Sequence, residues 1–175
     1  QIHKNLIKNN LLHGIEVVND TTYSDEAFQV ALDYNLTILG TSDIHDLIDW
    51  QYRVHAGGHR LVTLVFAFEK TEMSLKRALK LGKTVIWFNQ KLIGKVENLI
   101  PLINASLKVE TAHYIQNTTI AANFVIKSHS DAMHTLRNQS AYVFHNTTDL
   151  IMINPHSTMT LDVRTVEKKS RFELQ

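Results

Sequence analysis

The chain has 175 residues, 44% of them hydrophobic, which is enough to build one ordinary domain or two small ones. Its 18 basic and 17 acidic residues are interspersed and give a net charge of +1, so nucleic-acid binding has little electrostatic support. Cysteine is absent, which excludes disulfides and cysteine-ligated zinc sites without deciding the compartment. No apolar run reaches membrane-spanning length, and the first residues do not read as a signal peptide. Because the chain begins without Met, we expect an internal fragment.

Helices and strands alternate in the first part of the chain. Residues 3–12 suit the end of a helix, and residues 14–19 suit a short strand. Ser24 is suited to cap the next helix, and Asn35 can take the left-handed position at that helix's end. An apolar strand then covers residues 36–41. This short strand–helix–strand unit predicts a parallel pair of strands joined by a right-handed crossover.

The same pattern follows a second time. Residues 61–68 are rich in branched and aromatic side chains, as strands are, and residues 84–88 form a similar apolar run. Between them Thr71 can cap a helix over residues 72–81, which Gly82 closes. Near-continuous apolar strands are typical of a parallel sheet covered on both faces, so this part of the chain predicts an α/β architecture.

The pattern changes near residue 105. From there, apolar and polar residues alternate along several short segments separated by polar turns, which indicates antiparallel sheet with one wet face. We therefore predict an α/β domain over residues 1–105 and an incomplete, antiparallel β-sandwich-like domain over residues 106–175. The side chains expected to be buried there are Leu107, Val109, Phe124, Ile126, Leu161 and Val163.

The segment just after the strand at residues 36–41 carries the main functional signal. Asp43 and His45 are two residues apart, so in extended chain both side chains point to the same face. A carboxylate and an imidazole suit a divalent cation such as Zn, Mn or Fe. The bare pair is also common in solvated loops. In the loop that follows, His59 and Arg60 could contact an anion, although a solvated loop is the more common explanation for such residues.

The ordered segments GIEVVND, NLTILGTSDIHD, HRLVTLVFAFEK and GKTVIWF resemble the C-terminal part of PHP-domain phosphoesterases. The bacterial branch grouped with organophosphate phosphodiesterases is the most similar. Three later segments, SLKVETAHY, AYVFHNTTDLIMI and HSTMTLDVRT, resemble the β-rich extension that follows the barrel in that branch. The resemblance covers nearly the whole chain.

This resemblance implies a distorted seven-stranded β/α barrel with up to three divalent metal ions at its strand ends. Asp43 and His45 would be metal ligands, and Asp43 would also be catalytic by orienting the nucleophile. A metal-bound hydroxide would attack the phosphorus of a small phosphate ester, most readily a phosphodiester. Glu16 and Asn19, at the end of the neighbouring strand, could support the ligands, and a bland surface role for Glu16 is equally compatible with its position.

One departure from the family pattern limits these expectations. The family's H-x-H motif and its other early ligands have no counterpart here, since His3 is followed by Asn5. We therefore expect a phosphoesterase parent and an inactive isolated chain. Two alternatives remain: a non-catalytic β-rich binding module on a degenerate barrel, or another metal-dependent hydrolase of the amidohydrolase type. The sequence does not identify the substrate, the metal, the oligomeric state or the cellular location, cytoplasmic or exported.

Overall fold

The computed structural model describes residues 2–56, 58–89, 91–114 and 121–164. The chain divides into two compact units, unit 1 over Gln1–Ile100 and unit 2 over Pro101–Gln175. Each unit has its own hydrophobic core, and each is described by itself below. The domain boundary predicted after residue 105 stays a prediction.

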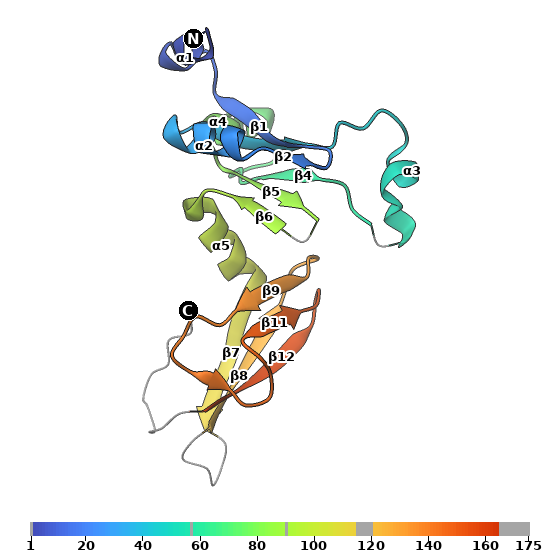
Figure 1. Cartoon of the computed structure of the whole chain (residues 1–175), viewed down its shortest axis with the longest axis vertical. Coiled ribbons are helices and arrows are strands. Elements are labelled where there is room, and N and C mark those ends of the chain that lie inside the picture. The colour runs from blue at the N-terminus through green and yellow to red at the C-terminus, as the bar shows by residue number, and fades with distance from the viewer. Residues whose placement is uncertain (1, 57, 90, 115–120, 165–175) are drawn as a thin grey trace. The chain divides into compact units, whose positions relative to one another are not determined.

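Unit 1 combines short helices with two small sheets (Figure 1). Its elements, in chain order, are α1 (Ile2–Lys8), β1 (Gly14–Asn19), β2 (Thr22–Tyr23), α2 (Asp25–Asp33), β3 (Thr37–Thr41), α3 (Ile48–Tyr52), a 3-10 turn (Val54–Ala56), β4 (Val62–Val65), α4 (Glu72–Lys80), β5 (Thr84–Phe88) and β6 (Lys91–Gly94). Helix α5 (Val96–Ser106) follows β6.

Strands β1 and β3 pair in parallel, which confirms the pairing predicted from the first strand–helix–strand unit. Ile15 lies opposite Ile38, and Asn19 lies opposite Thr41, so both strands end at the same edge of the sheet. The short strand β2 extends this sheet on the other side of β1 in antiparallel fashion. Val18 of β1 and Ile38 of β3 are essentially inaccessible and form part of the core of unit 1.

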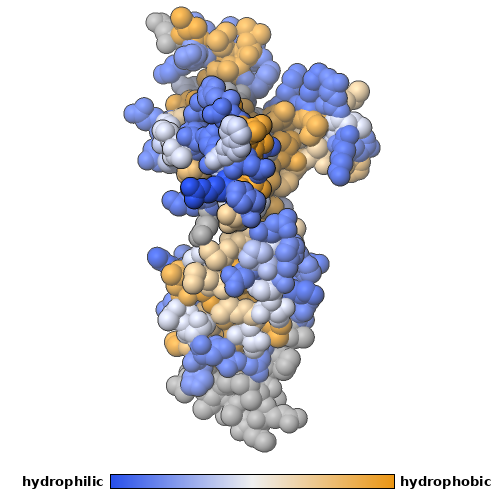
Figure 2. Space-filling model, turned by 90° about the vertical axis from the view of Figure 1, so that its right-hand side faces the viewer, coloured by the Kyte–Doolittle hydropathy of each residue, from blue (hydrophilic) through white to orange (hydrophobic). Residues whose placement is uncertain are grey.

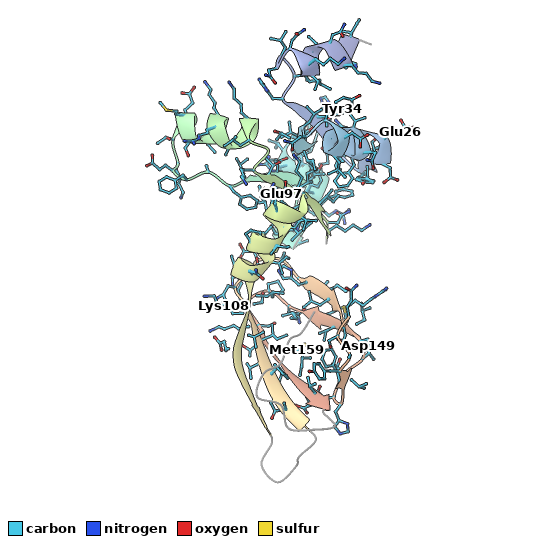
Figure 3. The ribbon with its side chains drawn as sticks, turned by 90° about the vertical axis from the view of Figure 1, so that its left-hand side faces the viewer. Glu26, Tyr34, Glu97, Lys108, Asp149 and Met159 are labelled. Atoms are coloured by element: carbon cyan, nitrogen blue, oxygen red, sulfur yellow. The ribbon has the colours of Figure 1, made fainter. Side chains whose placement is uncertain are left out.

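The helix ends follow the chemistry that the sequence predicted. The Ser24 hydroxyl accepts a hydrogen bond of 3.1 Å from the amide of Ala27, and so caps α2. Thr71 caps α4 in the same way. After these helices, Asn35 and Gly82 have φ angles of 52° and 67°, the left-handed conformation that lets the chain turn out of a helix. Figure 3 shows α2 with Glu26 in its first turn.

The prediction of a seven-stranded β/α barrel is wrong for the residues that the structure describes. Strands β4, β5 and β6 form a separate antiparallel sheet, although β4 and β5 were expected to belong to a parallel one. Val65 lies opposite Thr84, so the chain leaves β4 and enters β5 at the same end of the sheet. Helix α4, which lies between β4 and β5, buries only Ala78. Met73 within the helix is 81% exposed, and Phe68 in the segment before it is 96% exposed. An amphipathic helix between two strands therefore does not by itself show that the strands are parallel and joined by a crossover.

Unit 2 consists of antiparallel strands, as the alternating pattern predicted. The strands are β7 (Leu107–Tyr114), β8 (Ala121–Ser128), β9 (His134–Arg137), β10 (Val143–Phe144), β11 (Leu150–Ile153) and β12 (Thr158–Arg164). They form a four-stranded sheet in the order β10-β12-β8-β7 and a two-stranded sheet of β11 and β9. Phe124 and Leu161 from the first sheet pack with Ile151 and Ile153 from the second in one core. Figure 2 shows hydrophobic and hydrophilic residues interspersed on the visible face.

Four of the six side chains predicted to be buried in unit 2 are buried: Phe124, Ile126, Leu161 and Val163. Leu107 is only partly buried. Val109 is 56% exposed, which contradicts the prediction. Both lie on β7, which is the last strand of its sheet and changes register after Val109. An edge strand with a bulge loses the cover that the same alternation receives in a central strand.

Among the described residues, no helix has the length and apolarity needed to cross a bilayer.

Candidate functional site

The loop after β3 brings Asp43 and His45 together. The distance from Asp43 Oδ1 to His45 Nε2 is 3.6 Å, and the two side chains are 54% and 84% exposed. Asp43 has a φ of 45°, a left-handed conformation that is uncommon for residues other than glycine, although Asp adopts it more readily than most. The carboxylate and the imidazole are therefore accessible to solvent. The left-handed backbone conformation of Asp43 depends on contacts with the surrounding structure.

Asn19 ends β1 opposite Thr41, the last residue of β3, whereas Glu16 lies within β1, opposite Leu39, and not at the strand end where it was expected. The Glu16 carboxylate accepts hydrogen bonds from Asn19 Nδ2, with both of its oxygens at 3.3 Å, and from the Thr41 hydroxyl. The contact between Glu16 and Thr41 joins the two parallel strands just before the loop begins. This arrangement can keep the strand ends in place, and Glu16 is accordingly committed to neighbours within the sheet.

Two residues that the sequence analysis missed lie near the pair. The Tyr52 hydroxyl is 3.1 Å from Asp20 Oδ1 and 3.1 Å from the carbonyl oxygen of Ser42. Burial raises the pKa of the Tyr52 phenol, and the hydrogen bond to Asp20 raises it further, while the Arg60 guanidinium lowers it. Asp20 could have been found because it directly follows β1. Tyr52 is ten residues beyond Ser42 and no spacing rule points to it.

The His59 ring, considered above as a contact for an anion, already has neighbours at both of its nitrogens. Its Nε2 is 2.7 Å from the carbonyl oxygen of Asn89, its Nδ1 is 2.9 Å from that of Arg60, and its ring lies 4.5 Å from the ring of Trp87. Both ring nitrogens thus face backbone carbonyls, and binding a metal or an anion would require giving up at least one contact. Arg60 is exposed, and its positive charge lowers the pKa of the Tyr52 phenol, against the effect of burial and of Asp20.

The donor set fits part of a metal site. Two ligands held at about 2.0–2.2 Å from a tetrahedral ion stand roughly 3.3–3.6 Å apart, and the separation between Asp43 Oδ1 and His45 Nε2 matches that span. Within the described ranges, no group of three or more His, Cys, Asp or Glu residues could hold a metal ion. The described chain therefore offers a two-ligand fragment of such a site.

Comparison with solved structures gives a clear match. The chain resembles the crystal structure of a two-domain protein from Bacteroides vulgatus that contains a predicted PHP-like metal-dependent phosphoesterase. The TM-score is 0.84, the sequence identity is 30%, and the match covers 97% of this chain and 48% of that one. The chain thus spans about half the length of the structure it matches. This supports the resemblance at a coarse level, that of a region of a protein that contains a predicted PHP-like phosphoesterase.

A family model described as an Ig-like domain matches residues 107–175. Together with the two packed antiparallel sheets, this match points to an Ig-like β-sandwich in unit 2 and corrects the barrel-based fold assignment for the chain. No curated protein matches the sequence.

Proposed function

We propose that unit 1 contributes Asp43 and His45 as ligands to the metal centre of a metal-dependent phosphoesterase. The observation that carries this proposal is the 3.6 Å separation of the two ligand atoms, in an exposed loop at the carboxyl end of a parallel strand pair. Chemistry in α/β folds is usually placed at such strand ends. The likeness to a protein containing a predicted PHP-like phosphoesterase supports the same reaction class.

The side chains of unit 1 have defined tasks in this proposal. A divalent cation such as Zn, Mn or Fe, of which the complete centre would hold up to three, would supply Lewis-acid stabilisation of the phosphoryl oxygens. Asp43 and His45 would hold the ion, and the free oxygen of the Asp43 carboxylate can accept a hydrogen bond from the attacking water and orient it. The Arg60 guanidinium carries the positive charge that a phosphate ester would meet nearby.

Two protein ligands are fewer than the three that catalytic zinc sites generally use. The proposal therefore assigns the remaining ligands to residues outside the described part of this chain. The matched solved structure is about twice as long as the chain, which is compatible with such an arrangement. We assign small phosphate esters, and phosphodiesters first among them, as the substrate class.

The proposal is tested by substituting each ligand in the full-length protein. We expect Asp43→Ala or His45→Ala to lower turnover of an aryl phosphodiester by about a hundredfold or more, because loss of a ligand should cost at least as much as loss of a supporting residue. Bound metal, measured by elemental analysis after dialysis, should fall in parallel. The melting temperature should barely change, because both side chains are exposed.

His13→Ala is the matched control, since His13 is an exposed histidine just before the opposite, amino-terminal end of β1. It should leave both metal content and turnover unchanged. Full turnover with full metal content in the Asp43→Ala and His45→Ala variants would contradict the assigned roles. Turnover of an amide substrate in place of the phosphodiester would instead favour the amidohydrolase-type alternative.

A further inference from the structure

The Tyr52 side chain connects three segments that are distant in sequence. Its hydroxyl lies at hydrogen-bond distance from Asp20, just after β1, and from the backbone of Ser42, just after β3. Tyr52 itself ends α3, within the long excursion that the chain makes between β3 and β4 (Figure 1). A single phenolic hydrogen is thus shared between a carboxylate and a carbonyl oxygen. The same three segments are joined at one point beside the Asp43–His45 pair.

The backbone around this point is tied a second time. The amide of Asp20 donates a hydrogen bond of 2.9 Å to the carbonyl oxygen of Thr41. Asp20 therefore holds the end of β3 through its backbone and holds Tyr52 through its side chain. Asp20 itself has a φ of 50°, so its side chain reaches Tyr52 from a left-handed turn.

Ser42, whose carbonyl oxygen Tyr52 contacts, directly precedes Asp43. The peptide that Tyr52 contacts is therefore the one that enters the left-handed conformation of Asp43, with its φ of 45°. A residue in this region persists only where the surrounding structure over-determines it. Without the phenol, the Ser42 peptide loses this contact and the backbone at Asp43 can change conformation, which would alter the 3.6 Å separation of Asp43 Oδ1 and His45 Nε2.

We propose that Tyr52, together with Asp20, is a positioning residue that sets the backbone of the loop carrying Asp43 and His45. This inference rests on the proposed function for its metal-binding consequence, while the positioning itself is a property of the chain. The Tyr52 hydroxyl is at hydrogen-bond distance from Asp20 and from the Ser42 peptide, and it acts on the ligand pair through these two groups. Its contribution is the geometry of the ligand pair.

Hydrogen exchange in the metal-free full-length protein tests the positioning directly. Tyr52→Phe removes one oxygen atom and keeps the ring. We expect the Asp20 amide, which is hydrogen bonded to Thr41, to exchange about two- to tenfold faster, the effect of losing one ordinary hydrogen bond. Tyr34→Phe removes the same atom at the end of α2, where Figure 3 labels Tyr34, and should leave this amide unchanged.

The second readout is the metal itself. With Co²⁺ as the probe, Tyr52→Phe should weaken binding about ten- to a hundredfold, as loss of a group that orients a ligand does, and should alter the visible spectrum of the bound ion. A substitution that only reduced global stability would leave that spectrum unchanged in the loaded protein. Asp20→Asn, which keeps an acceptor for the phenol, should bind Co²⁺ more tightly than Asp20→Ala.

The outcomes separate the two proposals. Unchanged exchange of the Asp20 amide in Tyr52→Phe would overturn the positioning role, whatever the metal result. Faster exchange with unaltered Co²⁺ affinity and spectrum would overturn its link to the ligand pair. Failure of the unsubstituted protein to bind Co²⁺ would overturn the proposed function, and hydrogen exchange would still decide whether Tyr52 holds the loop.

Discussion

The exposure of histidine side chains differs between the loop after β3 in unit 1 and strand β9 in unit 2. His45 is 84% exposed beside a carboxylate, whereas His134 in β9 is 6% exposed. In the described part of the chain, His134 Nε2 has no hydrogen-bond partner. The Asp43 and His45 side chains of unit 1 are thus accessible for binding, while the core of unit 2 encloses a titratable ring. This comparison predicts that substitutions in the two regions affect different properties.

The largest effect on stability is expected in the core of unit 2. Phe124 is 3% exposed, and Phe124→Ala should lower the free energy of unfolding by about 3–5 kcal/mol, because it removes buried contacts and leaves a cavity. Val109→Ala is the matched control on the neighbouring edge strand. Since Val109 is 56% exposed, its loss should cost within about 0.5 kcal/mol.

Urea unfolding followed by circular dichroism measures both variants. Metal binding at Asp43 and His45 should be unchanged in Phe124→Ala under conditions where the protein stays folded. Equal losses of stability in the two variants would mean that the edge strand is covered in solution. The difference in side-chain burial between β7 and the central strands would then not hold.

A smaller effect is expected from the protonation of His134. Burial lowers the pKa of the His134 imidazole below its usual 6.5, because the charged form has lost its hydration. The unfolded chain then binds a proton more readily than the folded one below pH 6.5. The resulting stability is fully present above pH 6.5 and is lost as the pH falls from there through the lowered folded pKa.

Thermal melting between pH 7.5 and pH 5 measures this dependence. His134→Leu should flatten the acid limb of the melting curve, because no imidazole remains to be charged in the core. His129→Leu is the control, since His129 lies five residues earlier and is exposed. An acid limb that persists unchanged in His134→Leu would assign the pH dependence to other groups.

The smallest effect is expected at the cap of α2 in unit 1. Ser24→Ala removes the acceptor for the Ala27 amide and should cost about 1 kcal/mol. Thr71→Ala removes the equivalent acceptor on α4 and should cost a similar amount. Urea unfolding of both variants gives the comparison. A Ser24→Ala loss of several kcal/mol would show that α2 contributes more to unit 1 than its local hydrogen bonds indicate.

Local signals in the sequence determined much of the secondary structure. Ser24 and Thr71 act as caps, and Asn35 and Gly82 adopt left-handed conformations, because these depend on contacts within a few residues. Alternation also located β7, β8 and β12 of unit 2, since a side chain's face in a strand follows from its position, but it did not identify β9, β10 and β11. The prediction for Asp43 and His45 assumed extended chain, whereas Asp43 has a φ of 45°, so their separation in sequence alone does not account for their close approach.

Beyond the parallel pairing of β1 and β3, only the tertiary structure decided how the elements combine. The return of β4 to β5 through α4 is antiparallel because the two strands meet at the same end, and nothing in the helix sequence specifies this. Val109 is exposed because β7 is an edge strand, which its own alternation does not reveal. Tyr52 reaches Asp20 and Ser42 across 32 and 10 residues of chain. Contacts at such separations depend on the path of the whole backbone, so local sequence patterns carry no information about them.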